Sequence, residues 1–183
     1  MQFDSHPLNN KSRLTPDFFL RDVLLVAPDL LGNRLVRRFP DGTIKQFTIT
    51  EVEAYRGEED LACHASKGRT NRTEVMYRSG GHIYVYLIYG MHFMLNFVTE
   101  KEGIPQAVLI RGIDEIKGPG RVSKILSIDK RHNQTSLFES EELWVEDTGI
   151  VAGYFTDVRV GIDYAGDYWK NRPWRFIMKT GLE

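Results

Sequence analysis

Cysteine is almost missing from this chain of 183 residues, which contains Cys63 and no other. A single cysteine excludes an intramolecular disulfide and any metal site built from several cysteines, and it suits a reducing compartment. Histidines are also few, and none of the five stands at a metal-ligand spacing such as HxxxH. We therefore expect no metal and no cofactor, with Cys63-His64 plus distant acids as the remaining alternative for a metal.

Long apolar runs are absent as well. No stretch is long enough to span a membrane, and the first residues lack the basic and then apolar layout of a secretory signal. We expect a soluble intracellular protein without a membrane partner, in the cytoplasm and nucleoid of a prokaryote or the nucleus of a eukaryote. The length fits one domain, which we place at residues 14–183 behind a flexible tail at 1–13, and we expect a monomer.

Familiar nucleotide and hydrolase motifs are missing too. The chain has no Walker loop, no GxGxxG and no GxSxG, so the common nucleotide-cofactor and serine-hydrolase readings do not apply. The chemistry that remains available is that of carboxylates and water.

Excess positive charge is also lacking. The formal net charge is −1 and the pI about 6.5, whereas dedicated nucleic-acid binders are usually basic. Basic residues nevertheless gather in two places, before residue 82 and after the turn at 118–120. These residues either form one basic face or are scattered over the surface. The turn at 118–120 leads into a short predicted helix whose free N–H groups could hold a phosphate. The gathered residues are Lys67, Arg69, Arg72, Arg78, Arg121, Lys124, Lys130 and Arg131.

The pattern of apolar residues predicts an α+β fold with a largely antiparallel sheet. Residues 16–31 have helical periodicity, with Thr15 or Asp17 as possible caps. Alternating runs on both sides of the turn at 40–42 predict a hairpin over 34–55, and residues 106–111 form an apolar, buried strand. The polar stretch 56–80 is long enough to be a functional loop. The segment 157–180 reads as short strands and turns that close the domain.

Residues 82–96 predict a second hairpin with an aromatic tip, because a β-rich aromatic run breaks at Tyr89-Gly90 and then resumes. Tyr84 and Tyr86 share one face of its first strand. The ring of Tyr89 falls at the turn, where it could wedge between base pairs of a duplex. The alternative is that Tyr89 folds back and packs as an ordinary hydrophobic residue.

Two carboxylates continue an apolar stripe in the strand at 47–55. Strand alternation puts Phe47, Ile49, Glu51, Glu53 and Tyr55 on one face. If this face points inward, burial raises the carboxylate pKa values, as in general acids and bases. The alternative is a frayed strand end in solvent.

Arg111 ends the buried run at 107–111, where an arginine needs a carboxylate partner. A Glu53–Arg111 pair would satisfy both groups, as a structural or a catalytic ion pair.

Several segments together resemble one family, the alkyladenine (3-methyladenine) DNA glycosylases. The resemblance runs from about residue 14 to about residue 179 in the family's order and spacing. It is carried by residues 50–57, 60–64, 71–72 with Met76, 83–91 with Asn96, 108–111, 118–120, 124–128 and 159–162.

This resemblance implies a single domain with a curved, largely antiparallel sheet flanked by helices, and a protruding hairpin that enters the minor groove of double-stranded DNA. Tyr89, supported by Met91, would intercalate where a damaged purine nucleotide has flipped out of the duplex. The flipped base would lie between Tyr86 on one side and Tyr55 with His64 on the other.

The family likeness also implies further contacts with the DNA. His64 could hydrogen-bond to the sugar phosphate or the base, and Asn96 would disfavour unmodified guanine. Phosphate contacts would come from Arg72, Arg69, Arg121 and Lys124.

For the chemistry, the resemblance implies that Glu53 is the general base, which activates a water to attack the anomeric carbon. Arg111 and the backbone carbonyl of Val160 would position this water. The enzyme would be monofunctional and would leave an abasic site, since no lysine occupies a matched motif. Expected lesions are 3-methyladenine and 7-methylguanine, with ethenoadenine and hypoxanthine as further candidates.

Two other functions are compatible with the same residues. One is a damage- or shape-recognition module that binds DNA without catalysis. The other is a hydrolase of small glycosides or nucleosides.

Overall fold

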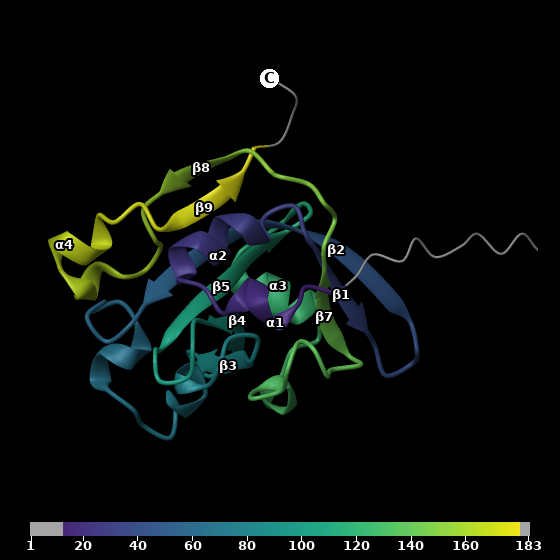
Figure 1. Ribbon diagram of the computed structural model, residues 1–183, viewed down its shortest axis with the longest axis horizontal. Coiled ribbons are helices and arrows are strands. Elements are labelled where there is room, and N and C mark those ends of the chain that lie inside the picture. The colour runs from purple at the N-terminus through teal and green to yellow at the C-terminus, as the bar shows by residue number, and fades with distance from the viewer. Residues whose placement is uncertain (1–12, 180–183) are drawn as a thin grey trace, which may run out of the picture.

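A computed structural model describes residues 13–179 of the chain (Figure 1). In these residues, nine strands form one sheet whose pairings are all antiparallel, and four α-helices and four short 3-10 helices accompany it. This confirms the α+β class. The strands are β1 Arg34–Arg38, β2 Ile44–Arg56, β3 Ile83–Ile88, β4 His92–Thr99, β5 Gln106–Ile113, β6 Ile116–Lys117, β7 Leu143–Glu146, β8 Tyr154–Asp157 and β9 Arg175–Met178. The helices are α1 Pro16–Phe19, α2 Val23–Leu30, α3 Pro119–Ile125 and α4 Asp167–Lys170, with 3-10 turns η1 His64–Lys67, η2 Glu74–Tyr77, η3 Lys130–His132 and η4 Asp163–Ala165.

Strand β2 is the centre of the sheet. The strand order is β3-β4-β5-β2-β1-β7, and β9 also pairs with β2 while β8 pairs with β9. The middle of β2 therefore lies between β5 and β9: Glu53 is opposite Leu109 on one side and Arg175 on the other. Figure 1 shows β8 and β9 along one edge of the molecule beside α4. Residues far apart in the sequence meet at Glu53 because of this arrangement.

The two faces of the sheet pack into different clusters of buried residues. In β3, Ile83 and Val85 belong to the main hydrophobic core with α1, α2 and α3. Tyr84 and Tyr86 alternate with them and belong to a second cluster with residues of the 56–80 loop. The predicted common face of Tyr84 and Tyr86 is thus confirmed, and the second face carries the site described below.

An irregularity in β2 changes which residues share a face. The register between β2 and β5 shifts at Ile49, Glu51 and Val52, as in a β-bulge. As a result, Ile49 packs in the main core together with Val52 and Ala54. The prediction that Ile49 shares a face with Glu51 and Glu53 was wrong, because strict alternation over 47–55 does not allow for an inserted residue.

The helix predicted over 16–31 is divided into α1 and α2. Asp22 interrupts it, since its side chain accepts the backbone N–H of Leu24 and caps a new helix. Thr15 stands at the N-cap of α1 but makes no side-chain capping bond there. The predicted hairpins at 34–55 and 82–96 and the strand at 106–111 are all present as β1–β2, β3–β4 and β5.

The turn between β3 and β4 consists of Tyr89, Gly90 and Met91. Ile88 pairs with His92, so the strands continue to the turn. Both Tyr89 and Gly90 have left-handed backbone angles, with φ of 52° and 70°. This conformation is easy for glycine and unfavourable for a tyrosine. Tyr89 is nevertheless 85% exposed, so it does not fold back to pack.

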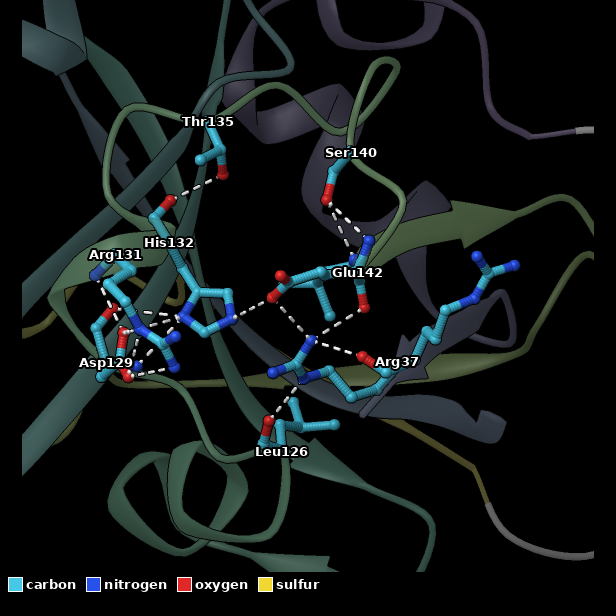
Figure 2. Close-up of polar contacts among 10 residues, drawn as sticks. Arg37, Leu126, Asp129, Arg131, His132, Thr135, Ser140 and Glu142 are labelled. Carbon is cyan, nitrogen blue, oxygen red and sulfur yellow. Dashed lines mark hydrogen bonds and ion pairs between the residues drawn. The ribbon is translucent and has the colours of Figure 1, made fainter. Parts of the chain in front are cut away.

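A polar cluster, shown in Figure 2, connects the segment after α3 to strands β1 and β7. The side chain of Arg37 is almost fully buried and donates to the carbonyls of Leu126, Arg38 and Glu142. Its Nη1 also lies 3.2 Å from the Glu142 carboxylate. His132 Nε2 is 3.5 Å from the same carboxylate. None of these residues lines the cavity described below.

The C-terminal segment closes the sheet with β9, and it contains two helical turns, η4 and α4, that the sequence did not predict. The proposed tail at 1–13 lies outside the described residues except for Arg13, whose guanidinium donates to the carbonyls of Phe138 and Ser140. Among residues 13–179, no helix is both long and apolar enough to cross a membrane.

Candidate active site

A cavity of about 510 Å³ opens on the second face of the sheet. Its walls come from β2 to β5, from the 56–80 loop and from the segment at 158–162, which connects β8 to η4. This volume is typical of sites for small molecules and is lined mainly by aromatic and apolar groups. Lining residues are Tyr55, Ala62, Cys63, His64, Arg72, Met76, Tyr84, Tyr86, Ile88, Tyr89, Met94, Asn96, Ala107, Leu109, Arg111, Pro119, Val160, Gly161, Ile162 and Tyr164.

Glu53 lies directly behind the wall of this cavity and is 0% exposed. One carboxylate oxygen, Oε1, accepts the backbone N–H of Val160 at 2.8 Å, and the other, Oε2, accepts the hydroxyl of Tyr55 at 2.8 Å. Burial raises the pKa of Glu53 above its ordinary value, although the charge of Arg111 and these two hydrogen bonds oppose the rise. The residues in contact with Glu53, namely Tyr55, Arg111 and Val160, all line the cavity.

Arg111 is shared between two carboxylates. Its Nη1 is 3.4 Å from Glu53 Oε1, and its Nε donates to Glu51 Oε1 at 3.1 Å. The predicted proximity of Glu53 and Arg111 is therefore present, but the hydrogen bond of Arg111 goes to Glu51. Arg175 in β9 donates to the same oxygen of Glu51 at 3.2 Å. Both predicted carboxylates thus point inward and are paired with arginines.

A buried ion pair supports Tyr55 from outside the cavity lining. The guanidinium of Arg159 donates to both oxygens of Asp60, at 2.5 and 2.9 Å, and to the carbonyl of Ala54. It also lies 4.9 Å from the centre of the Tyr55 ring, in a cation–π contact. Burial raises the pKa of Tyr55 well above its ordinary value, so the Tyr55 phenol stays protonated and donates to Glu53.

His64 lies beside Tyr84 and Tyr86. Its Nδ1 is 2.8 Å from the Tyr84 hydroxyl, and its ring is 4.5 Å from that of Tyr86, edge to face. Burial, together with the nearby charge of Arg72, lowers the pKa of His64 to about 4, so the ring is neutral at pH 7. The sequence prediction put Tyr86 and His64 on opposite sides of a base. This was wrong, because two rings in direct contact leave no space between them.

Asn96 is buried in the cavity wall, 3% exposed. Its side-chain amide donates to the carbonyls of Tyr84 and Met94. These bonds fix the orientation of the amide, so its oxygen is the group available to a ligand.

The mouth of the cavity combines exposed apolar and basic groups. Tyr89 and Met91 at the hairpin tip are 85% and 69% exposed. Arg72 lines the cavity, with its guanidinium 5.3 Å from the centre of the Tyr86 ring. Arg69, in contrast, makes a two-bond ion pair with Glu74.

Of the other basic residues predicted near the site, Arg121 and Lys124 of α3 are exposed. Pro119, at the start of the same helix, lines the cavity. Five of the predicted residues lie outside the lining: Glu53, Met91, Arg69, Arg121 and Lys124.

Sequence reasoning missed four residues of this site: Tyr84, Arg159, Tyr164 and Arg175. Tyr84 and Arg159 lay inside motifs already singled out, but their partners His64 and Asp60 are distant in sequence. Tyr164 lines the cavity and donates to the carbonyl of Ala62. Arg175 carried no local signal, because its pairing with Glu51 depends on the position of β9.

Within the described part of the chain, no three His, Cys, Asp or Glu side chains gather to hold a metal ion. Cys63 is buried, and this raises the pKa of its thiol to about 12, so the thiol is protonated at pH 7.

The site thus combines a cavity lined by aromatic residues, a buried carboxylate beside an arginine, and an exposed aromatic hairpin tip. These are the parts needed by an enzyme that hydrolyses the bond between a base and its sugar. Comparison with known proteins agrees. The family model described as "Methylpurine-DNA glycosylase (MPG)" matches residues 17–117 and 114–181. The chain belongs to the methylpurine-DNA glycosylase family, a family of DNA repair enzymes that hydrolyse N-glycosyl bonds.

Curated relatives match over nearly their whole length. A protein of Methanocella arvoryzae is 45% identical over an alignment 187 residues long. The alignment covers 91% of this chain and 92% of the relative. Relatives from Rickettsia felis and Legionella pneumophila are each 44% identical over 177 residues, covering 92% and 91% of this chain and 95% and 94% of theirs. All three carry the name "Putative 3-methyladenine DNA glycosylase".

Proposed function

We propose that this protein is a monofunctional 3-methyladenine DNA glycosylase that flips an alkylated purine out of duplex DNA and releases it by hydrolysis, leaving an abasic site. The observation that carries the proposal is Glu53. It is a fully buried carboxylate with a raised pKa, held immediately behind the wall of an aromatic cavity. The family membership and the names of the relatives support the same substrate.

In the proposed mechanism, the flipped base stacks in the cavity between Tyr55 on one side and the His64–Tyr86 pair on the other. Face-to-face stacking on tyrosine favours electron-poor rings, and a cationic purine adds a cation–π attraction. Met91 and Tyr89 fill the gap that the base leaves in the duplex, which offsets part of the few kcal/mol that unstacking costs. The fixed side chain of Asn96 occupies the space that the exocyclic amine of unmodified guanine would need, and this crowding disfavours that base.

The chemical step uses a water between Glu53 and the anomeric carbon. Each carboxylate oxygen of Glu53 accepts one hydrogen bond from the protein, so lone pairs remain for a water proton. The water oxygen bonds to the anomeric carbon, its proton passes to Glu53, and the electron pair of the glycosidic bond leaves with the base. Arg111 and the Val160 carbonyl orient this water. The N–H of Val160 donates to Glu53, and this bond holds the residue beside the carboxylate.

The substrate range follows from the leaving group. In 3-methyladenine and 7-methylguanine the base is already cationic, so the departing electron pair neutralises it. A neutral lesion such as hypoxanthine must be protonated before it leaves, and the buried phenols of Tyr55 and Tyr86 and the neutral ring of His64 are weak proton donors at pH 7. We therefore propose cationic lesions as the main substrates, with ethenoadenine and hypoxanthine released more slowly.

The test is single-turnover base release from duplex oligonucleotides that carry one lesion each, with wild type compared to Glu53→Gln. We expect release by the wild type and a loss of roughly 100- to 10,000-fold in the variant, the usual contribution of a general base. Duplex binding should persist, because Glu53 does not line the cavity. If no lesion is released while lesion-selective binding is intact, the protein is a recognition module and the catalytic proposal fails.

A further inference from the structure

The position of Arg111 depends on a residue outside the cavity. The Nε of Arg111 donates to Glu51, and this bond leaves the Nη1 end of the guanidinium facing Glu53. Arginine otherwise prefers to bind a single carboxylate through two parallel hydrogen bonds. Glu51 therefore binds the Nε donor of the guanidinium, which Glu53 could otherwise bind together with Nη1.

Glu51 is itself held in place. Arg175 donates to the same Glu51 oxygen that accepts from Arg111. Arg175 also donates to the carbonyl of Val158 at 2.8 Å and to the carboxylate of Asp157. Glu51 thus connects Arg111 to β9 and to the segment that carries Val160. The Glu51 side chain is 11% exposed and does not line the cavity, so it does not touch a base bound there.

The charges around Glu53 are nearly balanced in this arrangement. Arg111 of β5 lies beside both glutamates, Arg175 of β9 pairs with Glu51 and with Asp157, and Arg159 of the 158–162 segment is paired with Asp60. Two neutral phenols, Tyr55 and Tyr86, complete the surroundings. With Glu51 neutral, Arg111 would have Glu53 as its one remaining carboxylate partner among these groups.

We propose that Glu51 is a positioning residue for the glycosylase reaction, which keeps Arg111 beside the Glu53 carboxylate without letting it close over both oxygens. This inference rests on the proposed function of Glu53 as the base. Loss of the Glu51 charge lets Arg111 turn onto Glu53, where it covers the oxygen that a water needs and makes Glu53 a weaker base.

The kinetic test compares Glu51→Gln with wild type in single-turnover base release across pH. We expect the maximal rate to fall about 10- to 100-fold, as for a displacement of about 1 Å in a catalytic group, with duplex affinity unchanged. The acid limb of the rate profile should move to lower pH, since a strengthened ion pair lowers the pKa of Glu53. Glu51→Asp keeps the charge and should recover part of the rate.

Glu142→Gln is the matched control. It makes the same change beside another buried arginine, Arg37, in the cluster of Figure 2, away from the cavity. It should keep the wild-type rate and pH profile, even if stability changes. A wild-type rate and an unmoved acid limb in Glu51→Gln would overturn the inference while base release by the wild type upholds the proposed function.

A second readout does not need turnover. Carboxyl carbon NMR of glutamate-labelled protein follows the titration of Glu53 in wild type and in Glu51→Gln. We expect the Glu53 titration to move to lower pH in the variant. An unmoved titration refutes the role of Glu51, and this holds whether or not the protein releases a base.

Discussion

At the scale of one residue, Glu53 is a buried carboxylate whose ionisation lowers the stability of the folded state. Its carboxylate is removed from water, and burial outweighs Arg111 and the two hydrogen bonds in setting its pKa. A carboxyl whose pKa is higher in the folded than in the unfolded protein binds more protons when folded. The folded state therefore loses stability as pH rises above the ordinary value of 4.5.

The loss of stability with rising pH predicts the behaviour of Glu53→Gln, because the glutamine side chain cannot ionise. The free energy of unfolding of the variant, relative to wild type, should increase as pH rises from about 4 to 8. Denaturant unfolding of both proteins across this range measures the difference. A difference that is constant, or that moves in favour of wild type, would show that Arg111 and the hydrogen bonds outweigh burial.

Single residues also show what a sequence can predict about a site. The closeness of Glu53 to Tyr55 and Arg111 could be predicted from strand positions, because Glu53 and Tyr55 share a face of β2 and Arg111 ends the buried run in β5. The geometry around His64 was predicted wrongly, because side-chain packing between the 56–80 loop and β3 has no periodic signal. Arg159 and Arg175 were missed for a related reason: their partners, Asp60 and Glu51, are over 90 residues away in the chain.

At the scale of an element, the tip of the β3–β4 hairpin combines an unfavourable backbone angle with an unpacked ring. A non-glycine residue in the left-handed region costs roughly 1–2 kcal/mol. Tyr89 bears this cost without gaining buried surface in the free protein. Strain at an exposed position points to a use outside the folded chain itself.

Tyr89→Ala should consequently change the free energy of unfolding by no more than about 0.5 kcal/mol, as is typical of exposed positions. Base release from duplex DNA should fall, because nothing fills the gap left by the flipped nucleotide. Release from single-stranded DNA should change less, since no stacked pair has to be replaced. Tyr154→Ala, in β8, serves as a control that leaves both rates unchanged. Equal losses on both substrates would contradict a wedge.

The strands β1 to β5 were predicted as elements because each contains an apolar or alternating run bounded by turn residues. Two local events escaped. The cap at Asp22 divides one helical pattern into two helices. The bulge near Glu51 places Ile49, which precedes it, on the same side of β2 as Val52 and Ala54, which follow it. Both depend on hydrogen bonds that a hydrophobic pattern does not encode.

At the scale of the whole molecule, the net charge of −1 conceals different roles for basic residues. Arg69 forms an ion pair with Glu74, whereas Arg72 is exposed at the cavity and its guanidinium lies over the ring of Tyr86. The sequence alone does not distinguish Arg69 from Arg72, but their surroundings in the structure do.

Arg72→Ala should therefore weaken binding to duplex DNA and reduce the salt dependence of the association constant by about one unit of slope, the value for one phosphate contact. Arg69→Ala should reduce the slope less. Titrations of labelled duplex at several salt concentrations provide both slopes. A larger reduction for Arg69 would show that its pair with Glu74 opens on DNA.

The sheet order described above has a consequence for protein synthesis. Glu51, Glu53 and Arg111 are synthesised early, whereas Val160, which donates to Glu53, and Arg175 of β9, which donates to Glu51, come after β8 in the chain. A nascent chain that has folded β1 to β5 has a partial pocket and an incomplete set of contacts around its carboxylate. Among the described residues, the contacts of Val160 and Arg175 with the glutamates can therefore form only after the part of the chain that follows β8 has been synthesised.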